Sequence, residues 1–215
     1  MNATPMQDGE AVAACAAEVG IPISGAARDT LAAYARLLLT WGERINLTAA
    51  KTVREVARDH LPDSFAIARR LVEAGGAAER VIDVGSGGGL PALPLALLRP
   101  ESSFLLVEAT AKKVAFLRTA VRAMGLGARV EVKHGRAGRS IATELGDRGL
   151  FEVAMSRATL PPAEWLSLAE HLVLPGGRVF CLSSHAIGVW PPGLEWVGQT
   201  RYREDRWVAE LKRST

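Results

Sequence analysis

The residues most able to do chemistry form a glycine loop with an acid just ahead of it. Asp83 stands two residues before Gly85, and the loop continues as Gly85-Ser86-Gly87-Gly88-Gly89-Leu90. β-Branched residues precede the loop and an apolar, helix-like segment follows it. In this strand–turn–helix setting, glycines let the backbone approach a bound nucleotide closely. Leu90 stands where a dinucleotide fingerprint would carry its third glycine, so that fingerprint is incomplete.

Two acidic residues narrow the choice of ligand. The carboxylate of Asp83 suits a cationic or hydroxyl-bearing ligand better than a pyrophosphate. Glu108 ends the next strand-like run, so in a βαβ unit it would lie at the tip of the neighbouring strand, within reach of a ribose diol. A solvated glutamate at a strand end is the alternative reading of Glu108 alone. Together with the glycine loop, the two acids indicate S-adenosylmethionine (SAM) as the cofactor.

The elements that must position these residues differ between the two parts of the chain. From about residue 11 to residue 74 the apolar side chains have helical spacing. One helix face is formed by Leu31, Tyr34, Leu38 and Trp41. Thr52 and Glu55 form a capping box before a further helix, and Pro62 is expected to end that helix and open another. We therefore expect a helical N-terminal extension over residues 1–78.

From Arg80 onward, strand-type and helix-type segments alternate, as in a parallel sheet with helices on both faces. Strands are expected at Arg80–Val84, Phe104–Val107, Arg129–Lys133, Phe151–Met155 and Arg178–Leu182. The segments Leu194–Tyr202 and Trp207–Leu211 flank a charged turn and indicate an antiparallel hairpin. The expected fold class is therefore α/β: a Rossmann-like sheet, mostly parallel with a C-terminal antiparallel hairpin, which fits a SAM-dependent methyltransferase better than a dehydrogenase. This core would span residues 79–215 and form one structural unit with the extension.

The composition narrows the classes of protein that fit this sequence but does not identify its function. The 215 residues are 48% hydrophobic, enough for one substantial core. The sequence has no apolar run of membrane-spanning length and no basic-then-apolar leader, so we expect a cytoplasmic protein. Cys15 and Cys181 are too few and too far apart for a disulfide framework or a zinc site, and no metal is expected. A net charge of +3 and a pI near 9.1 permit nucleic-acid binding but do not require it.

Several motifs together resemble a known family. They are Arg44-Ile45-Asn46-Leu47-Thr48-Ala49, His60-Leu61-Pro62-Asp63-Ser64, the run from Asp83 to Pro91, Arg99-Pro100-Glu101, Lys112-Lys113-Val114-Ala115-Phe116-Leu117 and Ser156-Arg157-Ala158. From about Trp41 to Phe180, the chain is similar to the bacterial 16S rRNA (guanine-N7)-methyltransferase family RsmG, also called GidB. The glycine loop alone is a superfamily signal. The Asn-Leu-Thr and His-x-x-Asp-Ser elements, at this distance ahead of it, are far more specific.

The resemblance implies a class I methyltransferase fold and transfer of a methyl group from SAM to N7 of a guanosine in 16S rRNA, with S-adenosylhomocysteine as product. The cofactor-binding residues that we expect are Asp83, Gly85, Ser86, Gly87, Leu90, Glu108, Ala137, Gly138 and Arg157. By the resemblance, Gly85 and Leu90 would line the methionine side of the cofactor and Glu108 its ribose. Ala137 and Gly138 would supply backbone contacts around the adenine.

Arg157 is the residue expected to act in catalysis, by positioning and electrostatics. It directly follows a strand end, where open α/β sheets bind ligands, and its guanidinium can donate two hydrogen bonds to a guanine edge. On the RNA side we expect Asn46, Arg58, His60, Lys112, Lys113 and Arg136, with Arg54 and Arg139 as further phosphate contacts. Packing is the alternative role of His60, and a solvated helix face is the alternative for the two lysines.

The residues that the sequence lacks also favour this reaction. Guanine N7 has a lone pair and no proton to lose, so direct in-line attack on a sulfonium methyl needs no general base, and catalysis reduces to positioning and electrostatics. The sequence has neither the Asn/Asp-Pro-Pro-aromatic loop that orients an exocyclic amine nor the Pro-Cys pair of a covalent pyrimidine mechanism. It departs from the family pattern at Ala92, at Ser183-Ser184-His185 and in its short C-terminal tail.

Two other functions stay open at this point. A SAM-dependent small-molecule methyltransferase would share the cofactor site, but its helical extension would cover a closed apolar pocket. A non-catalytic rRNA-binding or assembly factor would keep the fold without cofactor affinity, against which the intact set of loop residues and acids argues. A dehydrogenase is disfavoured by Leu90. The partner that we expect is 16S rRNA or the small ribosomal subunit, bound by a monomer without membrane association.

Overall fold

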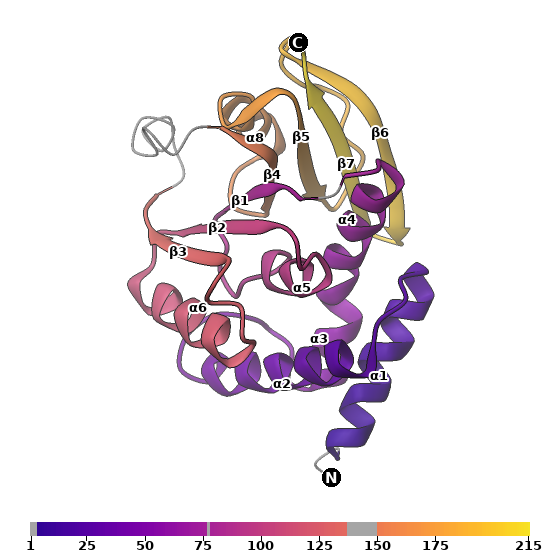
Figure 1. Cartoon of the computed structure of the whole chain (residues 1–215), viewed down its shortest axis with the longest axis vertical. Coiled ribbons are helices and arrows are strands. Elements are labelled where there is room, and N and C mark those ends of the chain that lie inside the picture. Colours follow the sequence, from indigo (N-terminus) through magenta and orange to yellow (C-terminus); the bar gives the residue numbers. More distant parts are fainter. Residues whose placement is uncertain (1–3, 77, 137–149) are drawn as a thin grey trace.

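The computed structural model describes residues 4–76, 78–136 and 150–215. Within these residues seven strands form one sheet flanked by helices (Figure 1). The strands are β1 (Arg80–Val84), β2 (Ser103–Glu108), β3 (Val130–His134), β4 (Phe151–Arg157), β5 (Val173–Ser183), β6 (Leu194–Arg203) and β7 (Arg206–Arg213). The helices are α1 (Pro5–Val19), α2 (Gly25–Gly42), α3 (Val53–Asp59), α4 (Leu61–Glu73), α5 (Ala92–Leu98), α6 (Ala111–Ala123) and α8 (Pro162–Ala169).

The strand order fixes where a ligand can bind. It runs β3-β2-β1-β4-β5-β7-β6, and β1 pairs in parallel with β2 on one side and with β4 on the other. The direction of winding therefore reverses between β1 and β4. Open α/β sheets bind ligands outside the carboxyl ends of the strands at such a point. The glycine loop, which follows β1, lies there.

The C-terminal hairpin brings residues that are distant in sequence to the edge of the sheet that carries the glycine loop. β7 pairs antiparallel with β5, and Ser183 at the carboxyl end of β5 faces Trp207 at the start of β7. The hairpin tip, residues 202–206, therefore lies at the edge of the sheet that also carries the glycine loop. The expected mostly parallel sheet with an antiparallel C-terminal hairpin is confirmed.

One strand differs from its expected bounds. β5 begins at Val173 rather than Arg178, and Val173 pairs with Phe151 before a register shift leads to the pair Val153–Arg178. Gly176, at a φ of 77°, lies within this irregular stretch. The Pro175-Gly176-Gly177 sequence therefore forms a bulge inside the strand, whereas such residues usually indicate a break before one.

Helices pack on both faces of the sheet. On one face, buried side chains of α1 to α6 join those of the sheet in a contiguous cluster that includes Tyr34 and Phe65. Trp41, which belongs to the helix face predicted from the sequence, is half-buried and packs edge-on against Phe116 of α6, with 5.7 Å between ring centroids. On the other face, Trp165 of α8 packs with Ile82 and Val84 of β1. In the described ranges, none of these helices combines the length and apolar character needed to span a bilayer.

Candidate cofactor and substrate site

A cavity of about 600 Å³ lies at the carboxyl ends of β1, β2, β3 and β4. Its lining residues are Leu47, Gly85, Ser86, Gly87, Gly88, Leu90, Val107, Glu108, Ala109, Lys113, Gly135, Arg136, Arg157, Ala158, Thr159 and Leu160. A cavity of similar size, about 590 Å³, lies among the strand starts near Arg80 and Ser103. Because open α/β sheets bind ligands at their carboxyl edge, the first cavity is the candidate site.

The glycine loop takes backbone conformations that favour glycine. Gly85, Gly87 and Gly89 have φ angles of 79°, 55° and 81°. The amide of Gly85 donates to the carbonyl oxygen of Val107 at 2.8 Å, and the amide of Ser86 donates to the same oxygen at 3.1 Å. These bonds fix the loop to β2 at the point where the cavity begins.

Glu108 is a buried acid at the end of β2, with 6% of its surface exposed. Its Oε2 accepts a 2.9 Å hydrogen bond from the amide of Gly87, and its Oε1 accepts a 2.7 Å bond from the amide of Thr110. These bonds orient the carboxylate along the cavity wall. Since each carboxylate oxygen has two lone pairs, Glu108 can also accept hydrogen bonds from a ligand's hydroxyl groups.

Asp83 is more deeply buried and does not line the cavity. Only 1% of its surface is exposed, and its Oδ2 has no hydrogen-bond partner among the described residues. Burial raises the pKa of the Asp83 carboxyl to about 7. A buried carboxylate with a free oxygen is costly unless a donor or cation reaches it. This carboxylate therefore suits a ligand that carries positive charge.

Arg157, the last residue of β4, lines the cavity and is held from α3 and α4. Its Nη1 lies 2.7 Å from Oδ2 of Asp63 and 3.3 Å from Nδ1 of His60. Since an arginine only donates, Nδ1 of His60 must be the acceptor and must lack a proton. Its Nε2–H is then free to donate to Oγ1 of Thr48, at 2.7 Å.

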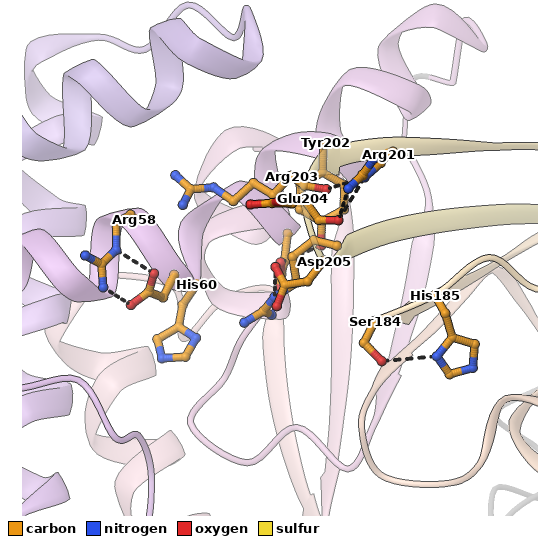
Figure 2. Close-up of polar contacts among 12 residues, drawn as sticks. Arg58, His60, Ser184, His185, Arg201, Tyr202, Arg203, Glu204 and Asp205 are labelled. Atoms are coloured by element: carbon orange, nitrogen blue, oxygen red, sulfur yellow. Dashed lines mark hydrogen bonds and ion pairs between the residues drawn. The ribbon is translucent and has the colours of Figure 1, made fainter.

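His60 is accordingly neutral and engaged through both ring nitrogens. Burial, together with the neighbouring cation of Arg157, lowers its pKa to about 4. Figure 2 shows His60 and Arg58 on one side of the hairpin tip and Ser184 and His185 on the other. Ser184 and His185 hydrogen-bond to each other at 3.1 Å. The segment that departs from the family pattern thus lies near this edge of the sheet.

The structure brings many of the expected site residues together. Around one cavity lie Gly85, Ser86, Gly87, Leu90, Glu108 and Arg157, together with Lys113 and Arg136. Five expected RNA-side residues do not line this cavity: Asn46, Arg54, Arg58, His60 and Lys112. Of these, Asn46 and Lys112 are exposed, and Arg58 pairs with Asp59 at 2.7 Å. Ala137, Gly138 and Arg139 lie outside the described residues.

Comparison with known proteins identifies the family. The family model described as rRNA small subunit methyltransferase G, GidB, matches residues 27–186. The chain belongs to this family. A "Ribosomal RNA small subunit methyltransferase G" of Cupriavidus necator is 36% identical over 182 residues, covering 81% of this chain and 74% of that protein. The protein of the same name from Anaeromyxobacter dehalogenans is 32% identical over 194 residues, covering 88% and 83%.

Solved structures support the fold. A putative O-methyltransferase from Klebsiella pneumoniae matches with a TM-score of 0.59 at 15% identity, over 85% of this chain and 90% of that one. A putative methyltransferase from Escherichia coli matches with a TM-score of 0.56 at 14% identity, over 71% and 86%. The class I methyltransferase fold expected from the sequence is therefore confirmed. Family and fold together imply the use of SAM.

Several residues lie in or beside the site although the sequence did not predict a role for them. Asp63 belongs to one of the family motifs, and its position in the apolar run Leu61-Pro62-Asp63-Ser64-Phe65 could have marked it as a buried acid. Ala158 has a φ of 53°, which is rare for a residue with a side chain, and it directs the chain from Arg157 to Thr159. Tyr202 and Arg206 reach Asp63 from the hairpin tip, a contact for which the sequence carries no local signal.

Proposed function

We propose that this protein transfers the methyl group of SAM to N7 of a guanosine in 16S rRNA. The observation that carries the proposal is the composition of the cavity wall. Its ionisable members are one acid, Glu108, and three cations, Lys113, Arg136 and Arg157. Within the described lining no side chain is suited to take a proton from an acceptor. An acceptor atom with a lone pair and no proton, such as guanine N7, fits such a site.

The residues present fit SAM. When bound, this cofactor would supply an electrophilic methyl group on a positively charged sulfur. Gly87 leaves the cavity wall free of a side chain at the loop, and Gly85 lines the cavity through its backbone, beside Thr159. Glu108 can accept hydrogen bonds from ribose hydroxyls. Oδ2 of Asp83, which has no hydrogen-bond partner among the described residues, suits the positive charge of the methionine portion. Ser86 and Leu90 would complete the loop side, and Ala137 and Gly138 the adenine side.

Methyl transfer by this site would rest on positioning and electrostatics. The carboxylate of Glu108 is held by two backbone amides, and His60 is engaged through both ring nitrogens. Neither is placed to act as a general base, and N7 attack requires none. Arg157 would act at the cavity mouth by donating hydrogen bonds to the guanine edge and orienting it for in-line attack. S-adenosylhomocysteine would be the product.

Cations next to the cavity would hold the RNA. Lys113 and Arg136 line the cavity and can contact phosphates beside the target nucleotide. We assign Asn46, Arg58, His60 and Lys112 to the surrounding RNA-facing surface. The same proposal includes a monomeric, cytoplasmic enzyme, with residues 1–78 as an extension of the SAM-binding core formed by residues 79–215.

The proposal is tested by methylation of defined substrates. Purified protein, SAM and unmodified small ribosomal subunits or 16S rRNA should yield 7-methylguanosine at one position, mapped by cleavage at the modified base. Methylation of an exocyclic amine or a pyrimidine would contradict the N7 assignment. SAM binding without rRNA methylation would favour a small-molecule acceptor, and rRNA binding without SAM binding would favour an assembly factor.

A further inference from the structure

Asp63 joins three parts of the chain through one buried carboxylate. It lies in the first turn of α4, and 1% of its surface is exposed. Its Oδ2 accepts a 2.7 Å hydrogen bond from Nη1 of Arg157, at the end of β4. Its Oδ1 accepts a 2.6 Å bond from the hydroxyl of Tyr202, beside the hairpin turn. Nη1 of Arg206, on β7, lies 3.7 Å from Oδ2.

These contacts define the orientation of Arg157 from one side. Nη1 of Arg157 points to two acceptors, Asp63 and Nδ1 of His60, that lie one helical turn apart in sequence. The carboxylate is itself oriented by the Tyr202 hydroxyl. A charge-assisted hydrogen bond in a water-poor environment is strongly directional and costly to leave unmade. The Arg157 side chain that lines the cavity is therefore restrained by residues that do not line it.

We propose that Asp63 is a positioning residue for Arg157, and that Tyr202 makes this positioning depend on the β6–β7 hairpin. The inference rests on the proposed function, in which Arg157 orients the acceptor base. It gives the β6–β7 hairpin a role in positioning Arg157, although the hairpin contributes no residue to the described lining of the cavity. The hairpin tip would then set the rate of methyl transfer through Asp63, without touching the cofactor.

The competing explanation is that Asp63 only stabilises the packing of α4 against the hairpin and does not position Arg157. Glu79 provides a matched control because it is also a buried acid, 8% exposed, that pairs with an arginine. Its Oε1 lies 3.0 Å from Nη2 of Arg99, and its Oε2 accepts a 2.6 Å bond from the hydroxyl of Ser102. Glu79 directly precedes β1, at the sheet edge opposite the cavity. Glu79→Gln should therefore lower the melting temperature without changing kcat.

The experiment compares single and double variants on unmodified small ribosomal subunits. Asp63→Asn should lower kcat by about tenfold or more, since small misplacements of a positioned group are costly. Its Kd for SAM, measured by calorimetry, should stay within about twofold of wild type because the proposed function assigns Arg157 to the acceptor base. Tyr202→Phe, which removes only a hydroxyl group, should lower kcat by about threefold or more. In an Arg157→Ala background, neither change should lower kcat further, because the group that they position is gone.

Each possible outcome either supports or overturns the inference. Wild-type kcat in Asp63→Asn, with a slow Arg157→Ala variant, would overturn the inference and leave the role of Arg157 intact. Equal loss from Asp63→Asn in both backgrounds would show a structural tie alone. Wild-type kcat in Arg157→Ala would overturn both the inference and the proposed role of Arg157. If Asp63→Asn does not fold, Tyr202→Phe and its double variant with Arg157→Ala decide by the same criteria.

A second readout does not depend on the RNA substrate. The guanidinium NMR signal of Arg157, assigned by its loss in Arg157→Lys, should be protected from solvent exchange in the wild type and in Glu79→Gln. In Asp63→Asn the protection should be lost, and in Tyr202→Phe it should be reduced. Unchanged protection in Asp63→Asn would overturn the inference. Failure of rRNA methylation by the wild-type protein would instead overturn the proposed function and leave this measurement valid.

Discussion

The side chain of Thr159 occupies the space that a Cβ atom on Gly85 would need. Its hydroxyl also donates to the carbonyl oxygen of Gly85 at 3.2 Å. Gly85 follows β1 and Thr159 follows β4, so the contact joins the two strands between which the winding direction of the sheet reverses. Both residues line the cavity, and any side chain at position 85 would disturb both of its walls.

Gly85→Ala should therefore weaken SAM binding by about tenfold or more, since the new Cβ collides with Thr159 and the φ of 79° is strained for alanine. Calorimetry and thermal unfolding measure the two effects. Gly125→Ala is the matched control: its φ is 69°, but no atom of residues 4–76, 78–136 or 150–215 lies within 4 Å of the added Cβ. It should cost about 1 kcal/mol of stability and leave SAM affinity unchanged. Combining Gly85→Ala with Thr159→Gly should restore part of the affinity, and a failure to do so would contradict the steric explanation.

Glu108→Ala should lose about 1.5 to 3 kcal/mol of SAM binding free energy, the range for hydrogen bonds to a charged group. The loss combines the proposed ribose contacts with the bonds that hold the amides of Gly87 and Thr110 in place. Competition between SAM and S-adenosylhomocysteine in calorimetry gives both affinities. Glu195→Ala, an exposed acid on β6, is the control and should bind normally. An affinity within about twofold of wild type for Glu108→Ala would exclude the assigned role.

Asp83 should make the stability of the cofactor-free protein fall as pH rises from about 4 to about 7. The folded-state pKa is raised to about 7 by burial, whereas the unfolded value is near 3.9. In this window the unfolded chain has lost the proton that the folded chain still holds, so deprotonation favours unfolding. Asp83→Asn has no such proton, so its stability relative to wild type should rise with pH up to about 7. Thermal unfolding from pH 4 to 8 measures this, and parallel curves for the two proteins would contradict it.

The same variant should bind SAM more weakly than the wild type at pH 8, where the charged wild-type carboxylate attracts the positive ligand electrostatically although it does not line the cavity. The two effects have opposite signs: from pH 4 to pH 8 Asp83→Asn should gain stability relative to the wild type, yet at pH 8 it should be the weaker binder. An improved affinity in Asp83→Asn would show that this carboxylate does not face a cation.

Charge reversal of Lys113 and Arg136 together should raise the KM for RNA and leave SAM affinity nearly unchanged. These side chains line the cavity from α6 and from the segment after β3, and phosphate contacts made by cations weaken steeply with salt. The double variant should therefore also show a shallower dependence of RNA binding on salt. Lys212→Glu, at the opposite edge of the sheet, serves as the control. Unchanged KM and unchanged salt dependence in the double variant would point to a small-molecule acceptor.

Local patterns were sufficient to predict the main features of the fold. The glycine loop, the acid at the end of β2 and the closing hairpin each depend on residues close together in sequence, and each was predicted from such residues. The start of β5 was not, because Pro175-Gly176-Gly177 can end a strand or bulge within one, and pairing of Val173 with Phe151 selects the bulge.

The contacts around Asp63 lay beyond sequence reasoning for a different reason. Tyr202 reaches Asp63 only because the register of β7 against β5 places the hairpin tip at the carboxyl edge of the sheet. A change of register would move the hydroxyl away without altering any local pattern. Likewise, Asp83 was expected beside the cofactor from its position before Gly85. Its burial, and the lack of a partner for its Oδ2 in the part of the chain that the structure describes, depend on the packing of the whole sheet.

The direction of β7 also has a practical consequence for handling the protein. The strand starts at the edge that carries the cavity and runs away from it, so Arg213 lies at the opposite edge, where Leu194 pairs with it. An affinity tag or biotin attached after Thr215 would therefore tether the molecule with its cavity turned away from the support. Immobilised in this way, the protein would present its cavity to the proposed rRNA substrate in a flowing sample, without the surface blocking access.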